Sequence, residues 1–335
     1  MSRLTRRELL RLATAAGAAA LGSLTPGHAA AEPPPETTSL KILQFPSGCQ
    51  GPIHAAEELL GSEGFTDVRY VPSSSTQDNL KMLDTRAVDV SIQFSAPLIM
   101  EIERGAEIVT LGGIHAGCFV LFGRDNVRSV RDLKGKTVSV PAFDSAAQLY
   151  VASMAAYVGV NPARDITWMT HSVDDATRMF RDGKVDAVMG FPPTAQELRA
   201  RKIGHVVVDS TVDRPWSQYF CCMMVTQRDF PRKYPVAAKR LVRAIVKANA
   251  VCAQEPERVA RRLVERGVVK QYDYALQIVK ELPYARWRDY DSTDTLRFYA
   301  LRLHEAGMVK STPQKIIAQG SDLRFVDELR KELKG

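Results

Sequence analysis

Strand and helix patterns meet in the stretch Val88-Asp89-Val90-Ser91-Ile92-Gln93-Phe94-Ser95-Ala96-Pro97-Leu98-Ile99-Met100-Glu101-Ile102-Glu103-Arg104. Apolar and polar residues alternate over 88–93, which predicts a strand, and apolar residues then recur at helical spacing over 96–104. Another apolar run, 108–112, follows and ends at a glycine. A strand, a helix and a second strand in this order indicate an α/β fold with a parallel sheet.

The same alternation continues on both sides of this stretch and forms two cycles. We expect further strands over 40–45, 68–71, 137–140, 166–169, 187–189 and 205–208, and helices over 52–61, 76–86, 146–158, 173–182 and 194–201. The chain is long enough for two lobes, each with its own core. We therefore predict two open sheets with flanking helices.

Two short apolar runs, about a hundred residues apart, separate the cycles: 118–122 and 219–225. If each is a strand that crosses between the lobes, the second lobe is an insertion in the first, and the pair of strands is a hinge. The predicted organisation is a first lobe over 40–117, a hinge strand over 118–123, a second lobe over 124–218, a hinge strand over 219–225, and a return to the first lobe with C-terminal helices over 226–335.

The amino-terminal segment has the pattern of an export signal. Thr5-Arg6-Arg7-Glu8-Leu9-Leu10 leads into an alanine-rich apolar run that ends at Ala29-Ala30-Ala31. The paired arginines before the apolar run are typical of a twin-arginine signal. We expect 1–31 to be removed, 32–39 to be an extended linker, and the product to be a soluble periplasmic protein that meets the twin-arginine translocase during export.

Charge and motifs argue against several classes of function. Removal of the four arginines and one glutamate of the signal lowers the formal net charge from +7 to +4, and no basic cluster is interleaved with aromatic residues. We therefore expect no nucleic-acid partner. The chain has no Gly-x-Ser-x-Gly elbow, phosphate loop or His-Glu-x-x-His pair. We expect no enzyme activity, no catalytic residues and no cofactor.

Four landmarks in sequence order resemble the solute-binding proteins of ABC importers, in the branch with taurine, alkanesulfonate and nitrate binders and thiamine-pyrimidine-synthase-like proteins. They are Val88-Asp89-Val90 with Gln93-Phe94-Ser95-Ala96-Pro97, Arg104-Gly105-Ala106, Asp132-Leu133-Lys134-Gly135-Lys136-Thr137-Val138, and Gly183-Lys184-Val185-Asp186-Ala187-Val188. The resemblance implies a type II periplasmic-binding-protein fold. It also implies a monomer that closes on a small solute and delivers it to an ABC permease and its ATPase.

Candidate binding residues follow the strands, because ligands of open α/β sheets bind beyond the carboxyl ends of the strands. Ser47 and Gly48 follow the first strand, and Gln93 and Ser95 end the third. Asp144 and Ser145 precede the helix over 146–158, and the resemblance favours Ser145 as a contact. The serines are equally suited to capping helices.

Four more candidates lie near the predicted hinge and pocket. The resemblance makes Phe191, in Gly190-Phe191-Pro192-Pro193, a candidate aromatic wall, with core packing as the alternative. His115 is placed at the hinge entrance, as an anion donor or as a structural donor. Trp216 and Tyr219 precede the second crossing and complete the set.

The five cysteines leave three states open. Cys118 and the Cys221-Cys222 pair become neighbours if the crossings lie side by side, so a hinge disulfide is one state. We favour buried free thiols, which folding in a reducing cytoplasm before export would produce. The third state is a site for a soft metal ion, formed by Cys49 and His115 together with Cys118 and the Cys221-Cys222 pair. The sequence has no Cys-x-x-Cys spacing, so we assign no metal ligand.

The sequence thus predicts a periplasmic solute-binding protein of an ABC importer for a small polar or anionic organic solute. Sulfonates, carboxylates, nitrate and heteroaromatic compounds are the candidate classes. One alternative is an exported ligand sensor that docks a membrane receptor. Another is a metal- or cofactor-binding protein similar to the pyrimidine synthases.

Overall fold

The computed structural model describes residues 32–73 and 76–333, so the predicted signal over 1–31 lies outside the described residues. Contacts divide the chain into 1–34 and 35–335, and the following concerns the second unit. Among its described helices, none combines the length and the apolar character needed to cross a membrane.

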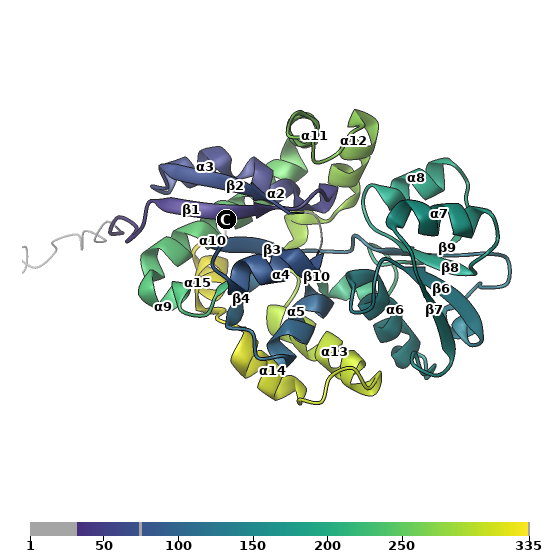
Figure 1. The fold of residues 1–335 in the computed structure, drawn as a ribbon. Helices are drawn as coiled ribbons and strands as arrows, with labels where there is room; N and C mark the ends of the chain where they lie inside the picture. Colours follow the sequence, from purple (N-terminus) through teal and green to yellow (C-terminus); the bar gives the residue numbers. More distant parts are fainter. Residues whose placement is uncertain (1–31, 74–75, 334–335) are drawn as a thin grey trace, which may run out of the picture. The chain divides into compact units, whose positions relative to one another are not determined.

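Two five-stranded sheets organise this unit (Figure 1). The strand order is β2-β1-β3-β10-β4 in the first sheet and β7-β6-β8-β5-β9 in the second. The strands are Ser39–Gln44 (β1), Asp67–Pro72 (β2), Val90–Phe94 (β3), Ile108–Ala116 (β4), Val120–Gly123 (β5), Lys136–Val140 (β6), Ile166–Thr170 (β7), Ala187–Gly190 (β8), His205–Asp209 (β9) and Phe220–Gln227 (β10). The predicted α/β class with two sheets is confirmed.

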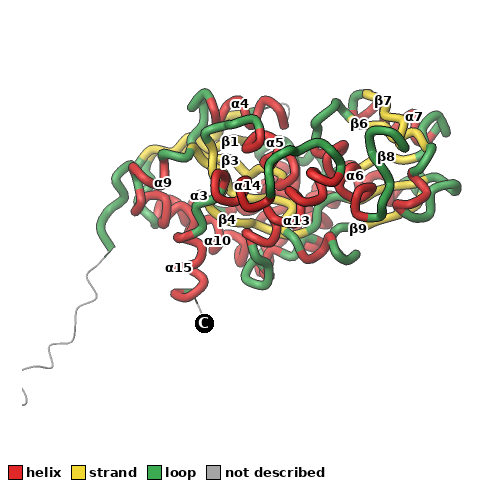
Figure 2. Tube along the Cα trace, turned by 90° about the horizontal axis from the view of Figure 1, so that it is seen from below, coloured by secondary structure: helices red, strands yellow, loops and turns green. Residues whose placement is uncertain are grey.

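Helices and loops surround both sheets (Figure 2). The α-helices are Gly51–Ala55 (α2), Glu57–Ser62 (α3), Thr76–Asp84 (α4), Ser95–Glu103 (α5), Ala146–Tyr157 (α6), Val173–Arg181 (α7), Thr194–Ala200 (α8), Phe230–Lys233 (α9), Pro235–Gln254 (α10), Pro256–Glu265 (α11), Tyr272–Glu281 (α12), Ser292–Glu305 (α13), Pro313–Gly320 (α14) and Arg324–Glu332 (α15). Short 3₁₀ helices are Gly48–Gln50 (η1), Val130–Leu133 (η2), Trp216–Gln218 (η3) and Tyr284–Arg286 (η4). Helices α10, α14 and α15 contact β4, so the carboxy-terminal part packs on the first sheet.

The two sheets share one plan. Strands β1, β2 and β3 are parallel, and β10 runs antiparallel between β3 and β4. Likewise β6, β7 and β8 are parallel, and β5 runs antiparallel between β8 and β9. We call the first sheet with its helices the first lobe, and the second sheet with its helices the second lobe.

The two apolar runs that were expected to cross each lie within one sheet. Among the described strands, β5 pairs within the second sheet and β10 within the first. Strand β10 pairs along its length with β3 and β4 and begins at Phe220, after the chain has returned to the first sheet. The chain instead passes between the sheets over 117–119 and 210–219.

These two crossing segments touch. Gly117 has a φ of +75°, and a Cβ built on it would lie 2.9 Å from the Cα of Thr211. Glycine is therefore required here both for its backbone conformation and for the close approach of the second crossing.

Three adjacent strands of the first sheet, β3, β10 and β4, are buried on both faces. Every residue of β3, β4 and β10 is buried, as expected for strands that helices cover on both sides. Strand β4 continues through Gly112-Gly113, where the sequence predicted its end. The reason is packing, because a Cβ on Gly113 would lie 2.1 Å from the ring of Phe220.

Tyr150 of α6 joins the second lobe to the first. Its fully buried ring stacks on Phe119 with centroids 4.1 Å apart. Its hydroxyl donates to the carbonyl of Cys221 at 3.0 Å and lies 3.0 Å from Ser95 Oγ. The contact holds α6 against the strand that returns to the first sheet.

Candidate functional site

A cavity of about 330 Å³ lies between the lobes, where the parallel strands end. Loops after β1, β6 and β8 supply most of its lining, together with the last residue of β3. The lining residues are Phe45, Pro46, Ser47, Phe94, Pro141, Ser145, Ala146, Ala147, Val173, Met189, Phe191, Pro192, Pro193 and Thr194. This is the position at which open α/β sheets bind ligands.

Three predicted residues meet at this cavity: Ser47, Ser145 and Phe191. Ser47 donates to the carbonyl of Pro192 at 3.4 Å and so links the lobes. Gly48, the next residue, is buried against Ile278, to which a Cβ would approach within 2.8 Å.

The predicted aromatic wall has a partner. The rings of Phe191 and Phe94 lie with centroids 4.9 Å apart, and both line the cavity. Because the rings come from different lobes, a flat or apolar part of a solute would contact both lobes at once.

Ser145 caps α6. Its hydroxyl donates to the carbonyl of Ala142 at 2.6 Å, and its oxygen accepts from the amide of Gln148 at 3.4 Å. The next residues, Ala146 and Ala147, line the cavity at the first turn, where backbone N–H groups have no partner within the helix. The positive end of the helix dipole lies there too, so this turn suits an oxygen-bearing group.

Asp144 lies at the edge of the cavity and does not line it. Its carboxylate pairs with Arg104, at the end of α5 in the first lobe, with Nη2 and Oδ2 2.5 Å apart. Both side chains are partly exposed. Asp144 therefore serves as a contact between the lobes.

His115 lies in β4 instead of at the hinge entrance, and its side chain is fully buried. Its Nδ1 lies 3.1 Å from the carbonyl oxygen of Ala116, and its Nε2 lies 3.1 Å from that of Cys49. His115 was predicted to be either an anion donor or a structural donor. It does not line the cavity, and its ring contacts two backbone carbonyls.

Four other predicted residues are also placed away from the cavity lining. Gln93 is buried and donates to Ser91 Oγ at 2.7 Å. Ser95 is buried and donates to the carbonyl of Phe220 at 3.0 Å. Trp216 and Tyr219 pack in an aromatic cluster with Tyr157, Phe298 and Tyr299. Ser95, Trp216 and Tyr219 thus contact segments that are distant in the sequence, whereas Gln93 bonds to a residue of its own strand.

Sequence reasoning missed the apolar half of the lining. Phe45, Phe94 and Met189 line the cavity beside the predicted polar residues. Large apolar residues at the carboxyl ends of three predicted strands were the available signal.

The cysteines do not all remain free thiols. Cys118 and Cys221 form a disulfide that joins the first crossing to the start of β10, with Cα atoms 6.6 Å apart. This corrects the expectation of free thiols for these two. Cys49, Cys222 and Cys252 are free and buried.

The environments of the free thiols differ. A hydrogen bond with Cys222 and the neighbouring His115 lower the pKa of Cys49 well below its usual range. Burial raises the pKa of Cys222 and of Cys252.

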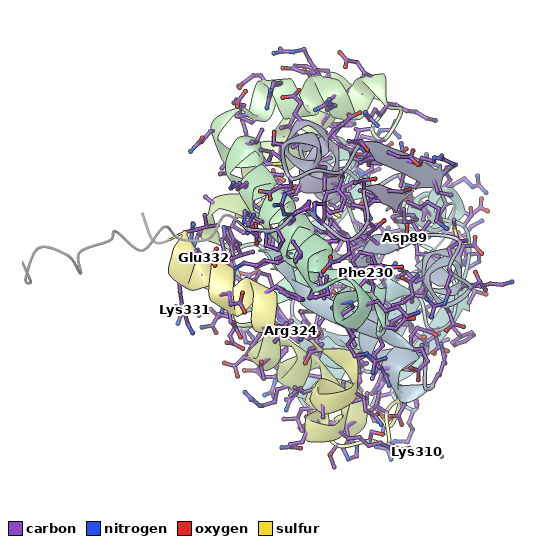
Figure 3. All side chains as sticks on the ribbon, turned by 90° about the vertical axis from the view of Figure 1, so that its left-hand side faces the viewer. Asp89, Phe230, Lys310, Arg324, Lys331 and Glu332 are labelled. Atoms are coloured by element: carbon purple, nitrogen blue, oxygen red, sulfur yellow. A yellow bond between two sulfur atoms is a disulfide. The ribbon has the colours of Figure 1, made fainter. Side chains whose placement is uncertain are left out.

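A second cavity, of about 310 Å³, lies at the opposite end of the first sheet. Asp89 and Phe230, which line it, are labelled in Figure 3, where α15 with Arg324, Lys331 and Glu332 is also seen. Arg86 and Lys233 both pair with Asp229 and lower its pKa to about 2. Arg86, Lys233 and Asp229 are thus engaged with one another, and the cavity between the lobes, at the carboxyl ends of the parallel strands, is the better candidate.

Comparisons with solved structures give the same fold. The alkanesulfonate-binding protein SsuA from Xanthomonas axonopodis pv. citri, bound to MOPS, matches with 16% identity and a TM-score of 0.68, over 86% of this chain and 99% of that chain. The periplasmic nitrate-binding protein NrtA from Synechocystis PCC 6803 matches with 14% identity and a TM-score of 0.72, over 90% of each chain. The periplasmic aliphatic sulphonate binding protein SsuA from Escherichia coli matches with 17% identity and a TM-score of 0.67, over 86% of this chain and 94% of that chain.

The type II periplasmic-binding-protein fold is thereby confirmed. A search of curated proteins finds no match. A family model described as NMT1/THI5 like matches residues 62–259, which is more than half of the sequence. The chain belongs to the NMT1/THI5-like family.

Proposed function

We propose that this chain is the periplasmic solute-binding component of an ABC importer and passes its solute to a membrane permease. The observation that carries the proposal is the cavity between the lobes, which residues of both lobes line at the carboxyl ends of the strands. A solute held there stabilises contact between the lobes, and closure then presents a distinct surface to the permease. The fold shared with sulfonate- and nitrate-binding proteins supports the same role.

The lining favours an organic solute over a bare inorganic ion. Phe94 and Phe191 offer two rings, whereas the described lining contains no Asp, Glu, Lys, Arg or His. The first turn of α6 with Ser145 offers the polar end. We propose a small organic acid or heteroaromatic compound with its apolar body between the rings and an oxygen-bearing group at α6.

The first test is a thermal-shift screen of the purified protein with sulfonates, aromatic and aliphatic carboxylates, nitrate, pyrimidines and, for comparison, cationic amines. A solute that binds the folded state alone raises the melting temperature. Isothermal titration of the best solute then gives its affinity. If cationic solutes alone stabilised the protein, the proposed site for an oxygen-bearing group at α6 would be wrong. If none of the organic acids or pyrimidines raised the melting temperature, the proposed class of solute would be wrong.

A matched pair of variants tests the location. Phe191→Ala removes one ring of the cavity, and we expect it to raise the Kd about 10- to 100-fold, since a buried ring contributes about 1.5–3 kcal/mol. Phe143→Ala is the control, because Phe143 is exposed (59%) and lies in the loop before α6 without lining the cavity. Equal effects of the two variants would exclude this cavity as the binding site.

A further inference from the structure

A buried cluster of two thiols and one imidazole lies behind the solute cavity. Cys49 of η1, Cys222 of β10 and His115 of β4 bring Sγ, Sγ and ring nitrogen within 4.8 Å of one another. The side chains are 0%, 1% and 0% exposed, respectively. Sulfur and imidazole are the donors that thiophilic metal ions prefer.

The strand register builds two sides of this cluster. Cys222 and His115 are directly paired residues of the antiparallel strands β10 and β4. Register shifts on both sides of Cys222 mark bulges, which redirect side chains and are frequent beside functional sites. Cys49 Sγ completes the group at 3.9 Å from Cys222 Sγ.

When the His115 ring is neutral, its two nitrogens cannot both donate a hydrogen bond to the carbonyl oxygens that they face. Both nitrogens face carbonyl oxygens at 3.1 Å, those of Ala116 and Cys49. A neutral imidazole has a single N–H, so only one of these contacts is a hydrogen bond. Donation from Nδ1 to Ala116 leaves a lone pair on Nε2, beside Cys49. Metal-bound histidines commonly hold their second nitrogen in this way, by donating to a backbone carbonyl.

Tyr284 supports the same geometry. Its hydroxyl donates to the carbonyl of Cys49 at 3.1 Å, and its ring packs edge-on against His115 with centroids 5.1 Å apart. The carbonyl of Cys49 therefore has a donor without His115. Tyr284 is itself fully buried, so it holds both η1 and the imidazole in place.

Ser47 connects the cluster to the solute cavity. Its hydroxyl oxygen lies 3.1 Å from Cys49 Sγ, and Ser47 lines the cavity. Ser47 thus lies between the lining of the cavity and the thiol of Cys49.

We propose that Cys49, Cys222 and His115 form a binding site for one thiophilic divalent ion such as Zn²⁺. Both cysteines bind as thiolates and release their protons on binding. A zinc site with three protein ligands keeps a fourth position open for water or another oxygen donor. Cys118 and Cys221 do not take part, because their sulfurs are bonded to each other. The proposal does not depend on the identity of the solute.

The test is competitive titration of the purified full chain with Zn²⁺ against a chromogenic chelator, and a parallel titration with Co²⁺. We expect one ion per chain and a near-ultraviolet thiolate-to-cobalt charge-transfer band. Cys49→Ser and Cys222→Ser should each weaken Zn²⁺ binding by more than about 100-fold, since loss of an outer partner alone costs about 10- to 100-fold. Either variant should also weaken the band.

Cys252→Ser is the matched control. Cys252 is also free and fully buried, but it lies outside the cluster. It should bind Zn²⁺ and Co²⁺ as the wild type does. Circular dichroism and melting curves show whether each variant folds. If the cysteine variants fail to fold, the wild-type cobalt spectrum and its loss on blocking the thiols with a mercurial decide the question.

Three results would overturn the proposal. One is a wild-type chain that takes up no ion, and another is equal weakening by Cys252→Ser. The third is mass spectrometry that finds Cys49 bonded to Cys222 in a second disulfide in the protein as purified.

Discussion

At the scale of single residues, His54 shows what burial without partners does to a titratable group. It is fully buried in α2, and neither ring nitrogen has a hydrogen-bond partner among the described residues. Burial, together with the charges of Arg266 and Arg262, lowers its pKa to about 3. The folded protein therefore keeps this imidazole neutral.

A pH dependence of stability follows from that pKa. Above pH 6.5 neither state protonates His54, whereas between pH 6.5 and 3 only the unfolded chain takes up the proton. This residue should lower the free energy of unfolding by about 2 kcal/mol between pH 7 and pH 5. Urea denaturation of the wild type and of His54→Leu at both values measures the effect. The variant should lose less stability over this interval, and identical losses would contradict the assignment.

Single residues also show where prediction of the site reached its limit. Ser145 and Phe191 were predicted from a cap position and a strand end together with the family resemblance, and both line the cavity. Gln93 and His115 were also candidates, but both side chains are buried, and the strands that carry them both pair with β10. A strand more than a hundred residues away leaves no local signal.

At the scale of elements, the sequence predicted the type and approximate bounds of most strands and helices. The helix expected over 146–158 is Ala146–Tyr157, and the strand expected over 166–169 is Ile166–Thr170. The bounds of β4 were wrong, since glycine commonly ends strands whereas Gly113 makes room for Phe220. The two runs expected to cross between the lobes instead form β5 in the second sheet and β10 in the first, because pairing is decided by contacts between distant segments.

At the scale of elements, we predict how much the disulfide between Cys118 and Cys221 stabilises the fold. Cys118 and Cys221 are 103 residues apart, so the bond closes a long loop around the whole second lobe. Its loss should lower the free energy of unfolding by about 2–5 kcal/mol. Melting curves with and without a reductant measure the loss in the wild type.

The variant Cys118→Ser/Cys221→Ser is the control for the reductant. It should melt at the temperature of the reduced wild type and should not respond to the reductant. A wild type whose melting temperature is unchanged after verified reduction would show that the bond contributes nothing.

At the scale of the whole molecule, polar pairs join the lobes on two sides of the cavity. Arg104 pairs with Asp144 on one side. On the other, Glu281 of α12 accepts from Gln196 at 2.9 Å and lies 3.4 Å from Arg199, both in α8. These contacts exist only when the lobes are together.

Removing one such group should shift the balance between closed and open forms. Exposed pairs contribute about 0.2–1 kcal/mol, so Glu281→Ala should favour opening by roughly 1.4- to 5-fold. The Kd for the solute should rise by a similar factor if the closed form is the one that binds. Energy transfer between dyes on the two lobes measures the first effect, and calorimetry measures the second.

Glu257→Ala provides the comparison. Glu257 pairs with Lys280 at 2.8 Å on neighbouring helices of the first lobe, so its loss leaves the contacts between lobes intact. Equal dye separation in the two variants would contradict a role for Glu281 in closure.

The position of β10 also affects the order in which the chain can fold during synthesis. Strand β10 fills the space between β3 and β4, although it is made more than a hundred residues after β3. A nascent chain that ends before residue 220 has no partner for those two edges, whereas all five strands of the second sheet, over 120–209, are already present. Local pairing forms before distant pairing. The second lobe should therefore fold on the ribosome before β10 has been synthesised and the sheet of the first lobe can be completed.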